Sequence, residues 1–231
     1  MWSRKGKIKE EVSYDEDGRI RERRSALNGK PEGEYTSYFG NGQVNARLYF
    51  VNGLREGDAF SYYENGQLRE KGSFKNNALE GEYISYYENG RIKEIENYID
   101  GKPDRKYTSF YTNGQIKDVE HFKDGKFHGE YISYYKDGRI KEQGNFKNDK
   151  RDGEYIAYDK SGRIREKAKF KNGKLEGEFQ CFSEETQYTG DDEEEAHVSA
   201  TGLKSLKEKE KRIDDLLNDL REFDKEKKET Q

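Results

Sequence analysis

Apolar and polar residues alternate along most of the chain in short runs that are separated by glycine. In residues 81–94, GEYISYYENGRIKE, one alternating run precedes an Asn-Gly pair and a second follows it. Alternation with a period of two is typical of β-strands, and Asn-Gly between two such runs favours a type I′ β-hairpin turn. Nearly the same letters, GEYISYYKDGRIKE, return at residues 129–142. The pattern therefore predicts β-hairpins that repeat along the chain.

The repeat has a constant length of 24 residues and no insertions. A glycine preceded by Asn, Asp or Ser marks each unit, at Gly18, Gly42, Gly66, Gly90, Gly114, Gly138 and Gly162. An aromatic column keeps step with it, at Tyr14, Tyr38, Tyr62, Tyr86, Phe110, Tyr134, Tyr158 and Phe182. A second aromatic column lies at Phe50, Phe74, Tyr98, Phe122, Phe146 and Phe170. Such regularity indicates units that contact only their neighbours.

The links between hairpins carry a further turn position. It is occupied by Gly29, Gly53, Gly101, Gly125 and Gly173, and by Asn77 and Asp149 in the two remaining links. Glycine, Asn and Asp best tolerate positive φ, so we expect a left-handed backbone there. The predicted fold is an all-β repeat protein, an extended twisted single-layer antiparallel meander of about seven 24-residue hairpins over residues 1–182.

The unit G-E-Y-x-x-Y-Y-x-N-G-x-I-K-E…F-x-N-G-K, over residues 11–182, resembles the variant MORN repeat of bacterial proteins often labelled YwqK-type antitoxins. It differs from the 23-residue MORN repeat with Tyr-x-Gly-x-Trp, since the one tryptophan here is Trp2. The resemblance implies a single sheet of successive hairpins. It also implies a protein that neutralises a toxin by binding.

The length of the hairpin turn decides which residues share a face of the sheet. A two-residue turn sets Tyr87 opposite Ile92, Tyr86 opposite Lys93 and Ser85 opposite Glu94. One face then carries Tyr83, Ser85, Tyr87, Ile92, Glu94 and Tyr98, and the other carries Ile84, Tyr86, Lys93 and Ile95. A three-residue turn with a glycine bulge would exchange the faces of the second strand. We favour the two-residue turn.

The periodicity changes after Phe182. Residues 183–202 hold seven acidic and no basic residues, which predicts an acidic flexible linker. Residues 203–231 predict one C-terminal amphipathic α-helix, with nine basic and nine acidic residues. Its apolar stripe needs a partner surface. We expect Leu216, Leu217, Leu220 and Phe223 to pack on the sheet near Tyr155, Phe170 and Phe179, with oligomerisation through the helix as the alternative and a monomer favoured.

Composition limits the classes of protein to which this chain could belong. The chain is 40% charged and 30% hydrophobic, yet 13% aromatic, which argues against disorder for most of its length. No signal-like or membrane-spanning apolar run occurs, so a cytoplasmic protein is expected. Cys181 is the single cysteine. His121, His128 and His197 lack ligand-spaced neighbours and are interpreted as solvated or turn residues, so neither metal nor cofactor is expected.

No catalytic residues are predicted. The column Glu22, Glu70, Glu94, Asp118, Glu142 and Glu166 offers equivalent carboxylates along an open sheet, whereas a catalytic pair needs differing environments in a cleft. We therefore expect a non-catalytic scaffold that binds a protein, with an antitoxin, immunity protein or inhibitor of a nuclease-like effector implied by the resemblance. Candidate partner-binding residues are Tyr62, Tyr86, Phe110, Tyr134, Lys93, Lys117 and Lys141.

Two other partners are weighed. The two-residue turn would interleave Arg21, Arg69, Lys93, Lys117, Lys141 and Arg165 with the first aromatic column, as in proteins that bind single-stranded nucleic acid. However, residues 1–182 carry a charge of only +3, from 35 basic and 32 acidic residues. This favours cross-strand packing of Lys stems on rings. Lipid binding ranks last, because the predicted helix is electroneutral.

Overall fold

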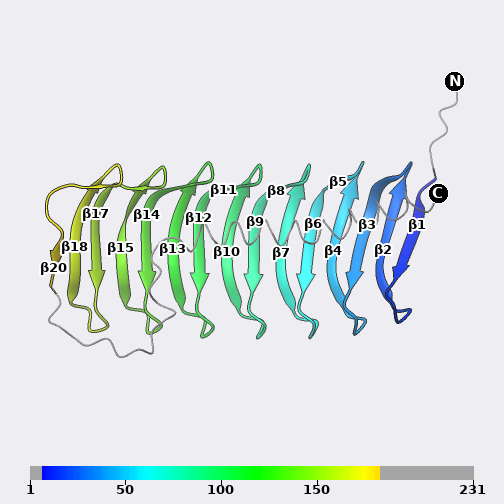
Figure 1. Ribbon diagram of the computed structural model, residues 1–231, viewed down its shortest axis with the longest axis horizontal. Helices are drawn as coiled ribbons and strands as arrows, with labels where there is room; N and C mark the ends of the chain where they lie inside the picture. Colours follow the sequence, from blue (N-terminus) through cyan, green and yellow to red (C-terminus); the bar gives the residue numbers. More distant parts are fainter. Residues whose placement is uncertain (1–6, 183–231) are drawn as a thin grey trace, which may run out of the picture. The chain divides into compact units, whose positions relative to one another are not determined.

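The computed structural model describes residues 7–182 of the 231-residue chain. These residues form one open antiparallel sheet of 20 strands and contain no helix (Figure 1). The linker, the helix and the tail-docking residues Leu216, Leu217, Leu220 and Phe223 lie outside the described residues. Successive strands pair along the sheet, which confirms the meander of hairpins for the part of the chain that is described.

Each hairpin has a first strand before its Gly-containing loop and a second strand after it. The first strands are β1 (Lys9–Tyr14), β3 (Lys30–Tyr38), β6 (Gly57–Tyr62), β9 (Gly81–Tyr86), β12 (Arg105–Phe110), β14 (Lys126–Tyr134) and β17 (Gly153–Tyr158). The second strands are β2 (Ile20–Leu27), β4 (Val44–Val51), β7 (Leu68–Lys75), β10 (Ile92–Ile99), β13 (Ile116–Lys123), β15 (Ile140–Lys147) and β18 (Ile164–Lys171). Two-residue strands follow the links at β5 (Leu54–Arg55), β8 (Ala78–Leu79), β11 (Lys102–Pro103), β16 (Lys150–Arg151) and β19 (Lys174–Leu175), and β20 (Gln180–Cys181) ends the sheet.

The links between hairpins are two-residue turns. Val51 pairs with Leu54, and the two residues between them, Asn52 and Gly53, have φ of 53° and 84°. Two consecutive positive φ values are the requirement of a type I′ turn. The expected left-handed backbone is confirmed at every link, at Gly29, Gly53, Asn77, Gly101, Gly125, Asp149 and Gly173.

The hairpin loops are three-residue turns, so the favoured two-residue turn is wrong. The Gly90 N–H donates to the Tyr87 carbonyl, and the Tyr87 N–H donates to the Arg91 carbonyl, both at 2.8 Å. Only Gly90 has positive φ in this loop, at 80°. The Asn89 side chain accepts a hydrogen bond from the Arg91 N–H at 3.1 Å. Its side-chain acceptor thus stabilises the longer loop, in which a single glycine takes the left-handed conformation.

A bulge one residue later restores the register. Tyr86 pairs with Ile92, whereas Ser85 pairs with Glu94, so Lys93 is an extra residue between them. The predicted pair Ser85–Glu94 is therefore confirmed, and the predicted pairs Tyr86–Lys93 and Tyr87–Ile92 are wrong. The same shift occurs in every hairpin from β1–β2 to β17–β18. Turn and bulge together keep the 24-residue period in phase with the pleat.

Hydrogen bonds at the links join each repeat to the one before it. The Gly53 N–H donates to the Pro31 carbonyl at 2.8 Å, and the equivalent bond recurs at every later link. A carboxylate adds a second bond: the Asn52 N–H donates to Glu32 Oε2 at 2.7 Å. Because these bonds recur with the same spacing, adjacent hairpins are held in one register.

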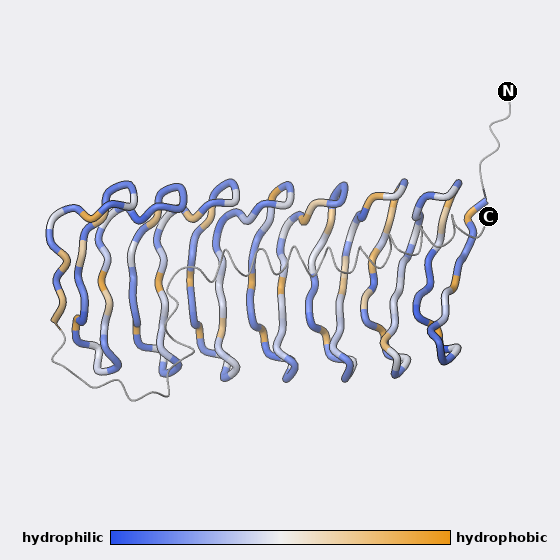
Figure 2. The backbone as a smooth tube through the Cα atoms, in the orientation of Figure 1, coloured by the Kyte–Doolittle hydropathy of each residue, from blue (hydrophilic) through white to orange (hydrophobic). Residues whose placement is uncertain are grey.

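The core is a row of rings on one face of the sheet. Tyr35 meets Phe50, and Tyr155 meets Phe170, edge to face with ring centroids 6.3 Å apart in both pairs. Hydrophobic residues occur as short segments scattered along the sheet among hydrophilic ones (Figure 2). Edge-to-face pairs between neighbouring strands therefore supply much of the packing.

Substitution of a loop glycine should lower the free energy of unfolding more in a hairpin that has a neighbour on both sides than in a terminal hairpin. Gly90→Val should lower the free energy of unfolding by about 1–2 kcal/mol, because a branched side chain is strained at φ 80°. Gly18→Val, at φ 78° in the first hairpin, should lower it less, since only one repeat neighbour is disturbed. Urea unfolding followed by circular dichroism measures both. Equal losses would contradict nearest-neighbour coupling.

Arg105 occupies a backbone conformation that glycine takes in the other repeats. Its φ is 69°, and the equivalent positions are Gly33, Gly57, Gly81, Gly129 and Gly153. Arg105→Gly should therefore raise the free energy of unfolding by about 1 kcal/mol, because the strain of an L-residue is removed. Lys106→Gly is the matched control, and it should destabilise by about 0.5–1 kcal/mol because flexibility increases within a strand. If both variants lost stability, the interpretation that the backbone is strained at Arg105 would be wrong.

Candidate functional site

One face of the sheet carries a column of carboxylates between columns of tyrosine and serine; we call it the carboxylate face. Glu94 is 8% exposed, Glu96 3% and Glu142 6%, although all three are acidic. Across the strands, Glu94 pairs with Ser85, Glu96 with Tyr83 and Glu142 with Ser133. Paired residues point to the same side of the sheet. Ionised groups are seldom this buried unless they are hydrogen bonded.

Tyrosine hydroxyls of the following repeat donate hydrogen bonds to these carboxylates. Tyr35 reaches Glu22 at 3.0 Å and Tyr107 reaches Glu94 at 3.2 Å, with the partners 13 residues apart in both pairs. Tyr155 lies 3.1 Å from Glu142 and 3.3 Å from Glu166, so one hydroxyl lies between two carboxylates. Serine hydroxyls contribute further bonds, from Ser61 to Glu70, Ser85 to Glu94 and Ser109 to Asp118. The carboxylates are therefore structural hydrogen-bond acceptors.

The pKa values of these groups follow from burial. Desolvation raises the pKa of Tyr107, and Glu94, Glu120, Glu96 and Asp118 add to the effect by repelling a phenolate. Desolvation also raises the pKa of Glu142, opposed by the hydrogen bond from Tyr155. A carboxyl whose pKa is raised on folding binds its proton more tightly in the folded state, so its contribution to stability increases as pH falls toward its ordinary value of 4.5.

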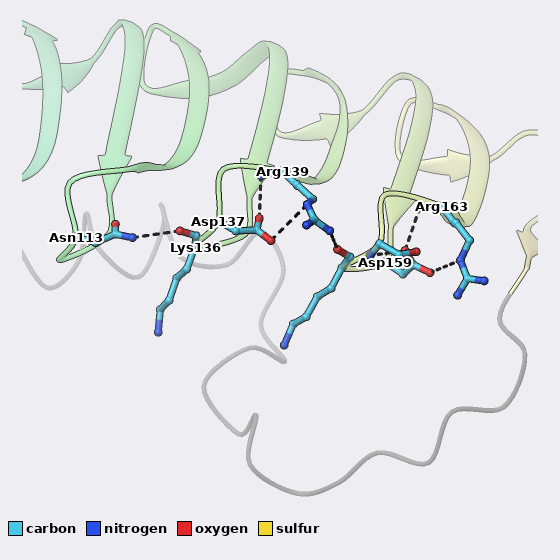
Figure 3. Close-up of polar contacts among 8 residues, drawn as sticks. Asn113, Lys136, Asp137, Arg139, Asp159 and Arg163 are labelled. Atoms are coloured by element: carbon cyan, nitrogen blue, oxygen red, sulfur yellow. Dashed lines mark hydrogen bonds and ion pairs between the residues drawn. The ribbon is translucent and has the colours of Figure 1, made fainter.

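A second set of tyrosines joins the hairpin loops. The hydroxyls of Tyr63, Tyr87, Tyr111 and Tyr135 each donate to the main-chain carbonyl 23 residues further on, at 2.6–2.7 Å. In the last described hairpin the position is Asp159, whose carboxylate instead binds Arg163 at 3.0 Å (Figure 3). Asn113 and Arg139 add bonds to the carbonyls of Lys136 and Lys160 in the next loop (Figure 3). In the sequence, the pattern that could have indicated these hydrogen bonds is the second tyrosine that follows the aromatic column in each of these repeats.

The bulge moves the basic column away from the face that the sequence predicted for it. Arg69 Nε lies 3.3 Å from Ser61 Oγ, and Arg165 lies 3.0 Å from Glu166. Lys141 lies over the ring of Tyr135, 5.9 Å from its centroid. These partners belong to the carboxylate face. The predicted interleaving of bases with the column Tyr38 to Tyr158 is therefore wrong, because the bulged residue points to the same side as the carboxylate after it.

The other face, which we call the apolar face, carries a continuous row of paired residues. Cross-strand partners run from Arg23 through Thr36, Arg47, Phe60, Lys71, Ile84, Ile95, Thr108, Val119, Ile132, Gln143 and Ile156 to Lys167. The middle of this row, from Ile84 to Ile156, is uncharged and mostly aliphatic, and basic residues lie on both sides of it. Most of its aliphatic members are partly exposed, Ile95, Val119, Ile132 and Ile156 among them.

The predicted partner-binding residues separate into two sets. Tyr62, Tyr86, Phe110 and Tyr134 pair with Leu68, Ile92, Ile116 and Ile140 at the loop end of the apolar face. All four aromatic residues are partly exposed. Lys93, Lys117 and Lys141 are the bulged residues beside the carboxylates. The structure therefore does not join the two predicted sets into one surface.

The recurrence of these contacts agrees with comparison to known families. The model of the MORN repeat variant matches six segments, 31–52, 55–76, 79–100, 106–124, 127–148 and 151–172, which together make up more than half of the chain. The chain belongs to the MORN repeat variant family. No curated protein matches the sequence.

Among the solved structures that match this MORN repeat variant protein, two illustrate a low sequence identity and a low TM-score. The GtfA/B complex bound to UDP and GlcNAc is 16% identical, with a TM-score of 0.21, and the match covers 59% of this chain and 24% of that chain. The TcdB2–TccC3 structure is 14% identical, with a TM-score of 0.23, and covers 70% and 12% of the two chains. The chain thus spans a quarter or less of either match.

The two histidines that the structure describes in this MORN repeat variant protein lie together at one link edge. His121, His128, Arg105, Lys123 and Glu130 line a shallow open recess. The Nδ1–H of His121 donates to the Glu130 carbonyl at 2.8 Å, since a carbonyl can only accept. Within residues 7–182, no three His, Cys, Asp or Glu side chains form a group that could hold a metal ion. None of the described segments is a helix long and apolar enough to cross a membrane.

Removing one tyrosine hydroxyl from the carboxylate face should destabilise the sheet. Tyr155→Phe leaves Glu142 and Glu166 without their shared donor, and we expect the free energy of unfolding to fall by about 1–3 kcal/mol. Tyr131→Phe is the matched control, because the Tyr131 hydroxyl is buried and has no hydrogen-bond partner. Its stability in urea should change by less than about 0.5 kcal/mol. An equal loss in both variants would contradict the role of the hydrogen bond.

Proposed function

We propose that this MORN repeat variant protein is a non-catalytic scaffold that binds another protein through the apolar face of its sheet. Its biological class would be an antitoxin, immunity protein or inhibitor that neutralises a toxin or nuclease-like effector by direct contact. The toxin-linked part of this proposal is supported by the resemblance of the repeat to YwqK-type antitoxins. The protein-binding part is supported by the composition of the apolar face.

The observation that carries the proposal is the row of paired residues across the apolar face. Ile84, Ile95, Val119, Ile132 and Ile156 lie near its middle, on successive hairpins joined by ladder hydrogen bonds. Tyr86, Phe110 and Tyr134 lie beside them at the loop end. Interface centres favour aromatic and aliphatic groups without charge, surrounded by a polar rim.

The dimensions of the row suit a protein partner. Adjacent strands lie about 4.8 Å apart, so the five hairpins from β6 to β18 extend for about 45 Å. A specific interface of about 800 Å² on each protein requires only part of this length. The repeat-to-repeat hydrogen bonds hold the row rigid, which lowers the entropic cost of binding.

The charges that surround the uncharged middle of the row have both signs. Arg47 and Lys71 lie toward one end of the row and Lys167 toward the other, while the middle is uncharged. Rim charges of this kind steer association and set register more than they add affinity. Glu82 and Glu130 lie on the same face, two residues from members of the row. The complementary surface would therefore be apolar in its centre and carry both signs of charge at its periphery.

Substitution in the middle of the row should weaken the complex. The protein encoded by the neighbouring gene is the first effector to test. For its complex with this chain, Ile132→Glu should raise the Kd by about 30-fold or more, because the substitution buries an unpaired charge at the interface centre. Lys126→Glu is the control: Lys126 is exposed at a link, and its substitution should leave the Kd within about threefold. Calorimetric titration measures both, and circular dichroism confirms the fold.

Two results would contradict the proposal. Turnover of a substrate by the purified protein, lost on changing one polar residue, would make it an enzyme. Binding of single-stranded RNA or DNA that weakens steeply with salt, and is lost on charge reversal at Lys93, Lys117 and Lys141, would favour nucleic acid as the partner instead.

A further inference from the structure

Seven asparagines of the chain are followed directly by glycine, and this pair of residues can react without an enzyme. The seven are Asn28, Asn41, Asn52, Asn65, Asn89, Asn113 and Asn172. The main-chain nitrogen of the glycine attacks Cγ of the asparagine side chain, because glycine has no side chain to hinder the approach. A carbonyl that accepts a hydrogen bond from this nitrogen opposes the attack, since the bond must break before the nitrogen can lose its proton and move.

Six of the seven glycine N–H groups donate a hydrogen bond to a main-chain carbonyl. In the four hairpin loops the acceptor lies three residues before the glycine, as in the bond from Gly90 to Tyr87 at 2.8 Å. In two links the acceptor belongs to the preceding repeat: Gly53 donates to Pro31 and Gly173 donates to Arg151, both at 2.8 Å. The nitrogens of these six pairs are therefore restrained.

Gly29 is the exception. It lies in the first described link, between β2 and β3, and its N–H has no acceptor among the described residues. The Asn28 N–H also lacks the carboxylate that Glu32 offers to Asn52 at 2.7 Å, because Ile8 occupies the equivalent position. Asn28 is exposed and has a φ of 52°, close to the 53° of Asn52, which is also exposed. The two links thus differ in their hydrogen bonds and not in the φ of the asparagine.

We propose that Asn28 is a site of spontaneous deamidation and that the other six Asn-Gly pairs are protected in the folded chain. The Gly29 nitrogen gives its proton to hydroxide and forms a bond to Cγ of Asn28. The side-chain nitrogen takes a proton from water and leaves as ammonia, which restores the hydroxide. Water then opens the resulting succinimide ring at either carbonyl. The net reaction consumes one water, releases one ammonia and leaves an ionised aspartate or isoaspartate.

The two products affect the link differently. Aspartate fits, because Asp100 and Asp124 occupy the equivalent position with φ of 49° and 53°. Isoaspartate routes the main chain through its side-chain carbon, which adds one atom to the two-residue turn between the paired residues Leu27 and Lys30. A longer turn disturbs this pairing, since turn length fixes the register of the strands that it joins. We expect the isoaspartate to loosen the link between β2 and β3.

Ageing of the full-length protein tests the site. The folded chain is incubated at mildly alkaline pH, where hydroxide is more abundant, and tandem mass spectrometry of its tryptic peptides follows each asparagine separately. We expect Asn28 to be modified at least about tenfold faster than Asn52 and Asn172, because a hydrogen bond must break first at the other two links. In urea all seven pairs should react at similar rates, since the hydrogen bonds are lost and each asparagine is followed by glycine.

Matched variants test the role of the missing hydrogen bonds. Ile8→Glu supplies a carboxylate where Glu32 lies in the next repeat, and it should slow the modification of Asn28 by about threefold or more. Ile8 is 56% exposed, so the substitution should not disturb the fold. Val12→Glu is the control, because it adds the same charge at a 36% exposed position further along β1, and it should leave the rate unchanged.

Hydrogen exchange measures the effect on the link. The amides of Leu27 and Lys30 should exchange faster in the aged protein than in Asn28→Asp, which reproduces the charge of the product without lengthening the main chain. Equal exchange in the two proteins would contradict the loosening of the link.

Three results would overturn the proposed site. Modification of Asn52 as fast as that of Asn28 in the folded protein would show that the link hydrogen bonds do not protect. Faster modification in a hairpin loop, at Asn89 for example, would place the reactive residue there. An equal rate in Ile8→Glu and Val12→Glu would show that the missing hydrogen bonds do not set the rate.

Discussion

The phase between the 24-residue repeat and the two-residue period of the pleat is the constraint on which the rest of this structure depends. A shift of one residue would exchange the two faces of a strand, and with them the aromatic core and the exposed aliphatic row. Each hairpin satisfies this constraint with two compensating features. A three-residue loop displaces the register by one residue, and a bulge such as Lys93 restores it. Seven repetitions of the same compensation keep Glu94, Glu142 and their equivalents on one face.

Because the register is kept, polar groups of successive repeats can form hydrogen bonds with each other. The hydroxyl of Tyr107 reaches Glu94 in the preceding repeat, while the hydroxyl of Tyr87 reaches the carbonyl of Phe110 in the following one. A repeat therefore leaves polar groups unpaired if it is displaced from its neighbours, which is a strong penalty for buried groups. This accounts for a core in which carboxylates and tyrosines replace the aliphatic residues of an ordinary sheet.

The proposed interaction surface is built from side chains on one face of the sheet. The apolar face offers side chains, with Ile95 and Ile132 in the middle and Arg47 and Lys167 toward the ends. Membership of the MORN repeat variant family accounts for the repeated scaffold, whereas Arg105 and the His121–His128 recess are features of single repeats.

The sequence by itself determined the hairpins, their period, the open antiparallel sheet and the positive φ at the links, because each follows from local residue types such as Asn52-Gly53 and from alternation. It also placed Ser85 opposite Glu94. Only the tertiary structure decided the three-residue loop and the bulge at Lys93, because two turn geometries fit the same Asn-Gly letters and differ by one residue. The tyrosine–carboxylate bonds were likewise decided there, since they join side chains 13 residues apart in separate hairpins. The face of the sheet on which the Lys141 side chain lies depends on that bulge, and no local pattern in the sequence indicates the bulge.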